Sequence, residues 1–177
     1  HTGGDSPSDG NVTAAALAEL QTLLQGSGYT MRAAVLEENG VTHNMLRMLG
    51  HVTQTHALAR LGDFVIVNTV ATGLQPLGRN SNGWDQGNIF FTPEKSWLSP
   101  PAVASQMIVA TSRGLRNVLD VSPPFPAGLD VLASCSDDGL QLSVQVANPT
   151  NASVTAVLVI GHVTSSVHVK VLAAENP

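Results

Sequence analysis

Two short apolar segments separated by one helical pattern constrain the fold of this chain more than any other feature. The first is MRAAVLEENG at residues 31–40, and the second is DFVIVNTV at residues 63–70. Between them, Met45, Leu49 and Val52 follow a spacing of four and three residues, which predicts a helix. An apolar strand, a helix and a second apolar strand form a βαβ unit, so we expect parallel strands with a helix on one face. The second strand is apolar throughout, which predicts burial on both faces.

The flanking segments extend this pattern. The first ten residues, HTGGDSPSDG, predict a loop, and the run from Thr13 to Gln25 predicts a helix. Thr42 is a candidate N-cap for the helix between the strands. The thirty residues from Ala71 are rich in Gly, Asn and Pro but carry two Trp and two Phe, which predicts an ordered loop. A short helix over 101–113 should follow.

The hydrophobic period changes from 3.6 to 2 after about Leu115. Residues 140–147 and 167–171 alternate apolar and polar side chains, and Asp137-Asp138-Gly139 supplies a turn at strand spacing. Short alternating strands separated by turns predict an antiparallel β-sandwich. We therefore expect an α/β region at residues 1–114 and an all-β sandwich domain at residues 115–177.

Composition excludes several classes of partner. The chain has 177 residues with a net charge of −5 and a pI near 5.5, and its eight Lys and Arg are scattered. Nucleic-acid and polybasic membrane binding are therefore not expected. No apolar run approaches the roughly 18 residues of a membrane span. The chain begins at His1 rather than Met, so we expect a processed or excised piece of a longer protein.

Cysteine and sequon patterns bear on the compartment. Cys135 is the single cysteine, so it cannot form an internal disulfide, and we expect a small buried strand residue. Asn11 and Asn151 each begin an Asn-X-Ser/Thr acceptor site for glycosylation. These two sites favour a secreted protein, extracellular or in a cell wall.

The order of these parts resembles a known enzyme family. The segments VLEENGVTHNMLRMLGHVTQTHALARLGDFVIVNTVATGLQP, NGWDQGNIFFTP, SPPAVASQM and DVLASCSDDGLQLSVQVAN are similar to the C-terminal part of the α-L-arabinofuranosidases of glycoside hydrolase family 51. The resemblance runs from about Met31 to Ile160. It implies the last βα units of a (β/α)8 barrel followed by a jelly-roll-like β-sandwich, and a retaining exo-glycosidase acting on terminal arabinofuranose. It implies no cofactor or metal.

The resemblance makes the carboxylate at the tip of residues 31–38 the nucleophile. Successive strand side chains point to opposite faces, so Glu37 and Glu38 cannot both face one substrate. If Glu37 faces the barrel interior, it shares that face with Met31, Ala33 and Val35, whereas Glu38 would bring Arg32 there. We therefore predict Glu37 as nucleophile, with Glu38 as second choice because a one-residue bulge would reverse the faces.

A retaining glycosidase needs a second carboxyl group about 5 to 5.5 Å from the first. In the family that resembles this chain, the acid/base carboxylate follows the fourth barrel strand, before the part that this chain matches. We therefore expect a partner: an N-terminal chain, or the remainder of the same precursor, carrying the other barrel strands and the acid. An arabinose-containing glycan is the expected substrate.

Other polar residues are candidates for the sugar site. Trp84 can stack on a sugar ring, Asp85 and Gln86 can bind hydroxyl groups, and packing of the loop is an equal alternative for Trp84. His43 and Asn44 follow the strand tip and can line the same site, or form a polar first turn of a surface helix. His51 and His56, five residues apart, are expected to be buried or capping histidines rather than metal ligands.

Two other classes of function stay open. Thr72 stands where better-known enzymes of the family carry a Gln that lines the site, which favours a catalytically inactive carbohydrate-binding or structural glycoprotein as an alternative. A third possibility is a sandwich module whose N-terminal half is disordered.

Overall fold

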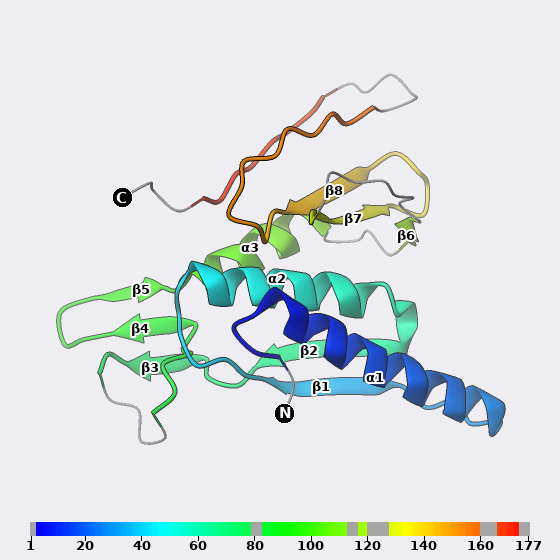
Figure 1. Ribbon diagram of the computed structural model, residues 1–177, viewed down its shortest axis with the longest axis horizontal. Coiled ribbons are helices and arrows are strands. Elements are labelled where there is room, and N and C mark those ends of the chain that lie inside the picture. Colours follow the sequence, from blue (N-terminus) through cyan, green and yellow to red (C-terminus); the bar gives the residue numbers. More distant parts are fainter. Residues whose placement is uncertain (1–2, 79–82, 113–116, 120–127, 160–165, 174–177) are drawn as a thin grey trace.

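The computed structural model describes residues 3–78, 83–112, 117–119, 128–159 and 166–173 (Figure 1). Within these residues the chain is a mixed α/β protein with three α-helices and three small sheets. The helices are α1 (Pro7–Gly26), α2 (Met45–Ala59) and α3 (Pro100–Ser112). The strands are β1 (Ala33–Glu38), β2 (Val65–Val70), β3 (Leu74–Pro76), β4 (Ile89–Phe91), β5 (Ser96–Leu98), β6 (Asn117–Leu119), β7 (Asp130–Cys135) and β8 (Leu142–Ala147).

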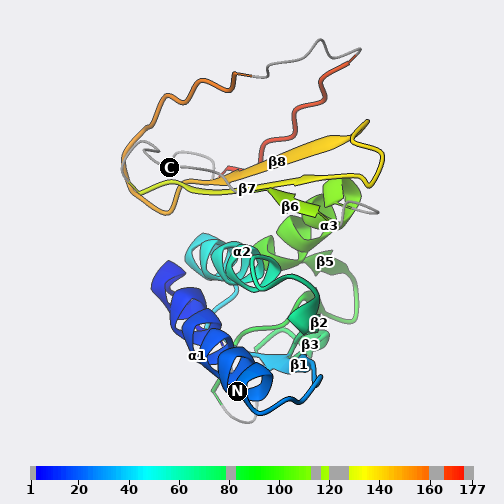
Figure 2. The ribbon, with the colours of Figure 1, turned by 90° about the vertical axis from the view of Figure 1, so that its right-hand side faces the viewer.

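The βαβ unit is present as predicted. Strands β1 and β2 pair in parallel, and α2 connects them through a short 3-10 turn at Gly62–Phe64. Helices α1 and α2 lie on one side of this two-stranded sheet (Figure 2). The other face is open, with Leu36 70% and Ile66 57% exposed. The expectation that β2 is buried on both faces is therefore wrong for the chain as described, because only one face has a covering layer.

An extra residue in β1 decides which way its side chains point. Val35 pairs with Asn68 and Glu38 pairs with Val70, so three steps along β1 oppose two steps along β2. Such a bulge breaks the two-residue alternation. Val35 and Glu38 are both buried on the helix-covered face, whereas Leu36 and Glu37 are exposed. The predicted sharing of a face by Val35 and Glu37 is thus wrong.

Helix α1 begins within the segment that we expected to be a loop. Ser6 is its N-cap, and a capping box joins the Ser6 and Asp9 side chains to each other's backbone N–H groups. Pro7 stands at the first helical position, where its fixed φ and missing N–H cost nothing. Gly10 is buried against α2, and a Cβ there would lie 2.5 Å from Cα of Gln54. The absent side chain therefore allows α1 and α2 to approach closely.

Helix α2 lies between α1, α3 and the C-terminal sheet. Its N-cap is Asn44, whose side chain accepts from the Arg47 N–H, rather than Thr42 as expected. The predicted stripe of Met45, Leu49 and Val52 is only half-buried. The most buried positions include polar side chains: Arg47, His51, Thr53, Gln54 and His56. This helix is therefore held by a polar network as well as by apolar contacts.

The predicted aromatic loop contains a small sheet. β3 pairs in parallel with β4, and β4 pairs antiparallel with β5. Phe90 in β4 is fully buried between the rings of His43 and Trp97, with ring centroids 4.4 and 6.0 Å away. Trp97 therefore packs, as expected. In Figure 1 this sheet lies beyond the carboxyl end of β1.

The C-terminal region forms one antiparallel sheet in the order β6-β7-β8. β8 confirms a strand within residues 140–147, and its register with β7 runs from Asp130 opposite Ala147 to Cys135 opposite Leu142. The expected burial of its apolar side chains is wrong, because Leu142 and Val146 are exposed while Ser143 is buried. Cys135 is half-buried. Residues 167–171 form no strand, and Val167, Val169 and Val171 are exposed. One three-stranded sheet is described, so the second layer of the expected sandwich is not demonstrated.

None of the helices within the described ranges is long and apolar enough to cross a bilayer.

Candidate functional site

The carboxyl end of β1 is the place where the predicted site residues meet. Asp85 donates its backbone N–H to the Val41 carbonyl at 2.9 Å, so the aromatic loop lies against the residues that follow β1. The side chain of Gln86 is buried and reaches the same segment, where its Oε1 accepts from the Gly40 N–H and its Nε2 donates to Asn39 Oδ1 at 3.2 Å. The structure thus brings Trp84, Asp85 and Gln86 to the tip that carries Glu37.

Glu38 is at the centre of a buried charged network. Its Oε1 lies 2.8 Å from both Arg47 Nη2 and His51 Nδ1, and its Oε2 accepts from Asn68 Nδ2 at 2.7 Å. The residue is 1% exposed. Burial raises the pKa of Glu38, but the hydrogen bond and charge of His51, the charge of Arg47 and the Asn68 hydrogen bond outweigh it, so the net pKa is lowered. Glu38 is therefore an ionised carboxylate with both oxygens occupied.

The N-terminal segment covers this network. Gly3 lies so close that a Cβ there would be 2.9 Å from Cγ of Glu38, and Arg47 Nη1 donates to the Gly4 carbonyl at 3.2 Å. Oδ1 of Asp5 accepts from the Val41 N–H at 2.8 Å and lies 4.0 Å from Arg47 Nε. Because these residues lie over it, the Glu38 carboxylate does not face solvent.

Glu37 differs from Glu38 in its exposure to solvent. It is exposed at the carboxyl end of β1, on the face that the helices leave open. Its backbone carbonyl lies 3.5 Å from Asn39 Nδ2, which in turn contacts Gln86. The tip is therefore held by its backbone while the Glu37 carboxylate projects from the open face.

A second buried amide, the side chain of Gln75 in β3, is hydrogen-bonded to the aromatic loop. Gln75, 3% exposed, donates to the Trp84 carbonyl at 3.2 Å and to Asp85 Oδ1 at 3.0 Å, and its Oε1 accepts from the Gly87 N–H at 2.7 Å. These three bonds span residues 84–87, which we call the clamped loop. Trp84 within it is 37% exposed.

His43 and Asp85 form a partly exposed pair beside this loop. His43 Nδ1 lies 2.9 Å from Asp85 Oδ2 and 3.2 Å from the Asp85 carbonyl oxygen. The imidazole ring rests on Phe90. The predicted candidates His43 and Asp85 are therefore in direct contact.

The other predicted residues have different positions. Asn44 caps α2. His51 and His56 are both buried, as expected, and join α2 to neighbouring elements. Asn11 is exposed on α1 and Asn151 is exposed in a bend after β8, so both sequon side chains reach the surface.

Sequence reasoning missed the residues that support the site. Gln75, Arg47 and Asn68 lie in segments interpreted only as a loop, a helix and a strand. A polar residue within a predicted buried strand, as Asn68 is, was a usable signal, because buried polar groups need partners. Gln75 carried no comparable signal in the sequence.

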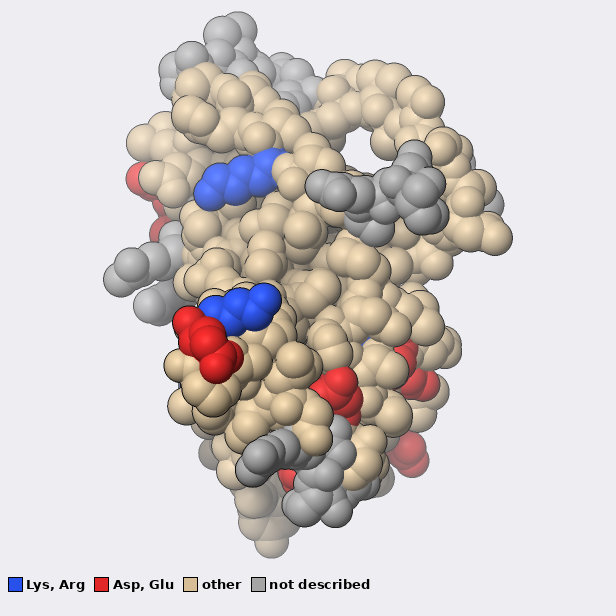
Figure 3. All heavy atoms as spheres, turned by 90° about the vertical axis from the view of Figure 1, so that its left-hand side faces the viewer, with Lys and Arg blue, Asp and Glu red and all other residues tan. Residues whose placement is uncertain are grey.

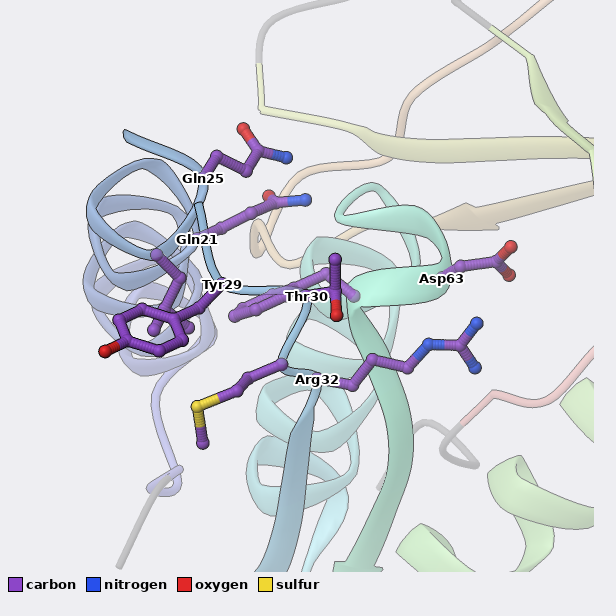
Figure 4. Close-up of a pocket in the computed structure, with 9 residues that line it drawn as sticks. Gln21, Gln25, Tyr29, Thr30, Arg32 and Asp63 are labelled. Carbon is purple, nitrogen blue, oxygen red and sulfur yellow. The ribbon is translucent and has the colours of Figure 1, made fainter. Parts of the chain in front are cut away.

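A shallow hollow lies at the other end of β1 (Figure 4). It has a volume of about 260 Å³ and is lined from α1 by Gln21 and Gln25, from the chain before β1 by Tyr29 and Arg32, and near β2 by Asp63 and Phe64. In Figure 4 Arg32 and Asp63 lie on one side and Tyr29 on the other. The hollow lies at the amino end of the strand, away from Glu37, and contributes nothing to the cluster described above.

Basic side chains do not gather into a patch on the face shown in Figure 3. Lys and Arg lie apart from one another there, one of them beside acidic side chains, and acidic side chains are more frequent. Within the described parts of the chain, no group of three or more His, Cys, Asp or Glu is placed to hold a metal ion. The clamped loop is thus bonded to Asn39, Gly40 and Val41, the residues that directly follow the exposed Glu37 and the buried Glu38.

Comparisons with protein-family models, with curated proteins and with solved structures give no match to this chain.

Proposed function

We propose that this chain is part of a retaining exo-glycosidase that hydrolyses terminal α-L-arabinofuranosyl residues from arabinose-containing polysaccharides or glycoproteins, with Glu37 as the nucleophile. The observation that carries the proposal is the difference in exposure between two adjacent carboxylates. Glu37 is exposed at the carboxyl end of a parallel strand, where barrel enzymes hold their catalytic groups, and Glu38 is buried and fully bonded.

The accessible carboxylate is the better nucleophile. Attack on an anomeric carbon requires an oxygen that the sugar can reach. Both Glu38 oxygens accept hydrogen bonds, from Arg47 and His51 on Oε1 and from Asn68 on Oε2, and Gly3 covers the carboxylate. The bulge in β1 puts Glu37, not Glu38, on the face away from α2. The first choice made from the sequence is retained, for a different reason.

The reaction requires a second carboxyl group. Glu37 would attack the anomeric carbon and form a glycosyl ester while a carboxylic acid protonates the leaving oxygen; the same group, then a carboxylate, would activate the water that cleaves the ester. We propose that the acid lies on an N-terminal chain or on the remainder of the same precursor.

The open side of β1 and β2 supports such a partner. Leu36, Ile66 and Val67 expose apolar surface there, and a two-stranded parallel sheet leaves both edges unpaired. Further parallel strands would cover the face and pair the edges, as in the expected (β/α)8 barrel, and the β6-β7-β8 sheet would be one layer of the jelly-roll-like sandwich. The exposed sequons at Asn11 and Asn151 support an extracellular or cell-wall location.

Mechanism-based labelling tests the proposal. The natively purified protein is treated with an arabinofuranosyl-configured cyclophellitol-type inactivator, and the labelled peptide is identified by mass spectrometry. We expect the label on Glu37, with none on the Glu37→Gln variant. Labelling of Glu38 instead would transfer the role to the second choice. No label, with a partner chain present, would favour the inactive carbohydrate-binding or structural glycoprotein.

A further inference from the structure

We infer that His43 and Asp85 form an oriented pair in which Nε2 of His43 accepts a hydrogen bond from a sugar hydroxyl group. The inference deepens the proposed function and rests on it, because it assigns a sugar-binding role at the same strand tip. It concerns a defined atom with a defined proton state, whereas the sequence pattern identified His43 only as a candidate to line the site.

Asp85 determines which nitrogen of His43 carries the proton. Nδ1 faces two acceptors, Asp85 Oδ2 at 2.9 Å and the Asp85 carbonyl oxygen at 3.2 Å. Neither oxygen can donate, so Nδ1 must carry the proton. In neutral His43 the lone pair is therefore on Nε2. Among the described residues, no hydrogen-bond partner occupies His43 Nε2, and the side chain is 36% exposed.

The pair is fixed on several sides before any sugar arrives. Oδ1 of Asp85 accepts from the buried Gln75, and the Asp85 backbone is bonded to Val41. The His43 ring contacts the ring of the fully buried Phe90, with centroids 4.4 Å apart and planes tilted by 46°. A ring in contact with a buried neighbour and bonded at Nδ1 has little rotational freedom left to lose on binding.

An oriented, neutral Nε2 selects a particular ligand chemistry. A lone pair next to a carboxylate attracts O–H donors and offers nothing to anionic groups, which fits a neutral sugar rich in hydroxyl groups. Trp84, partly exposed in the same clamped loop, adds an aromatic face.

Nitrogen NMR tests the proton state directly. The full chain is labelled with ¹⁵N-histidine, and the signals of His43 are assigned with the His43→Gln variant. We expect the proton on Nδ1 in the parent and a larger share on Nε2 in Asp85→Asn, whose amide can donate to Nδ1. The exposed His168, replaced in a His168→Gln control, should leave the His43 signals unchanged. A proton on Nε2 in the neutral parent overturns the inference.

Sugar binding followed by NMR, together with hydrolysis kinetics, tests this inference independently of the proposed reaction. Methyl α-L-arabinofuranoside is titrated into the protein labelled with ¹⁵N-histidine, and we expect the His43 Nε2 signal to move. In hydrolysis of 4-nitrophenyl α-L-arabinofuranoside, Asp85→Asn and His43→Gln should raise KM about tenfold, the value of roughly one hydrogen bond, with a smaller effect on kcat. Unchanged KM with Glu37 labelled would overturn the role of the pair and leave the proposed reaction standing. A shifted Nε2 without labelling at Glu37 would support the pair and overturn the reaction.

Discussion

His51 joins Glu38 to α3 through its two ring nitrogens: Nδ1 lies 2.8 Å from Oε1 of Glu38 and Nε2 lies 2.7 Å from Oγ of Ser105. One buried side chain therefore connects β1, α2 and α3. Arg47 and Asn68 complete the shell around the same carboxylate. The stability of the α/β region should depend strongly on the charge of Glu38.

Replacing Glu38 by Gln should destabilise the chain by about 3 kcal/mol, because the substitution leaves the Arg47 guanidinium buried without its counter-charge. Urea unfolding followed by circular dichroism measures the change. Glu37→Gln is the matched control, one residue away and exposed, and should change stability by less than about 0.5 kcal/mol. Equal effects of the two variants would contradict the assignment of Glu38 as the buried anchor.

Acid should unfold the parent through its lowered carboxyl pKa values. Burial raises the pKa of Asp130, but the hydrogen bonds and charges of His56 and Arg60 lower it by more, so the net pKa is lowered. His51 and Arg47 have the same effect on the pKa of Glu38. A carboxylate with a lowered pKa in the folded state contributes stability above its unfolded pKa and loses it as pH falls through the folded pKa. The free energy of unfolding should therefore decrease below about pH 4.

The variants Glu38→Gln and Asp130→Asn test this dependence because each removes one titrating group. Unfolding free energies measured at a series of pH values should fall less steeply with acid in each variant than in the parent. A slope that neither substitution alters would assign acid sensitivity to other carboxylates.

His56 should be the main polar link between α2 and the C-terminal sheet. It is fully buried, with Nδ1 2.8 Å from Asp130 Oδ2 and Nε2 3.1 Å from Gln145 Oε1. His56→Ala should cost about 2 to 4 kcal/mol, because it leaves a cavity and two acceptors without this partner. Hydrogen exchange read by mass spectrometry should accelerate in β7 and β8. His168→Ala, at an exposed position, is the control and should leave exchange unchanged.

Gly87 should tolerate no side chain, because a Cβ there would lie 2.5 Å from Cβ of Gln75. Gly87→Ala should therefore displace the clamped loop, at a cost of about 1 to 3 kcal/mol, and alter the fluorescence of Trp84 measured in a Trp97→Phe background. Gly73→Ala is the control, since no described atom lies within 4 Å of its Cβ position. A normal Trp84 spectrum in Gly87→Ala would show that the loop adjusts without moving the ring.

Sequence patterns predicted the elements whose period is regular. The parallel pairing of β1 with β2 followed from the βαβ order, and β8 followed from its alternation. The start of α1 was missed although Ser6, Pro7 and Asp9 form a helix-start signal, because the glycine and serine content suggested a loop. The strands β3, β4 and β5 are three residues each, too short for a period to show.

The sequence predicted which residues meet at the site, but it did not predict which face of β1 each glutamate occupies. His43, Trp84, Asp85 and Gln86 meet near the strand tip, as adjacency to β1 and an ordered aromatic loop suggested. The orientation of Glu37 depends on the bulge between Val35 and Glu38. No sequence pattern predicts this bulge, because Leu36 and Glu37 are residue types that also occur in regular strands. Long-range bonds from Gln75 and Arg47 are equally invisible in one sequence, because each joins segments that are distant along the chain.

The bulge also changes how this chain must be aligned with others. A version lacking Leu36 would regain strict alternation, with Val35 inward, Glu37 outward and Glu38 inward, and each carboxylate would keep its face. A gap of one residue just before the two glutamates is therefore neutral to the site. Suppose instead that this chain is aligned without a gap to a regular strand and matched up to Val35. Glu37 would then be paired with an inward-facing residue and Glu38 with an outward-facing one. The buried and the exposed carboxylate would be exchanged.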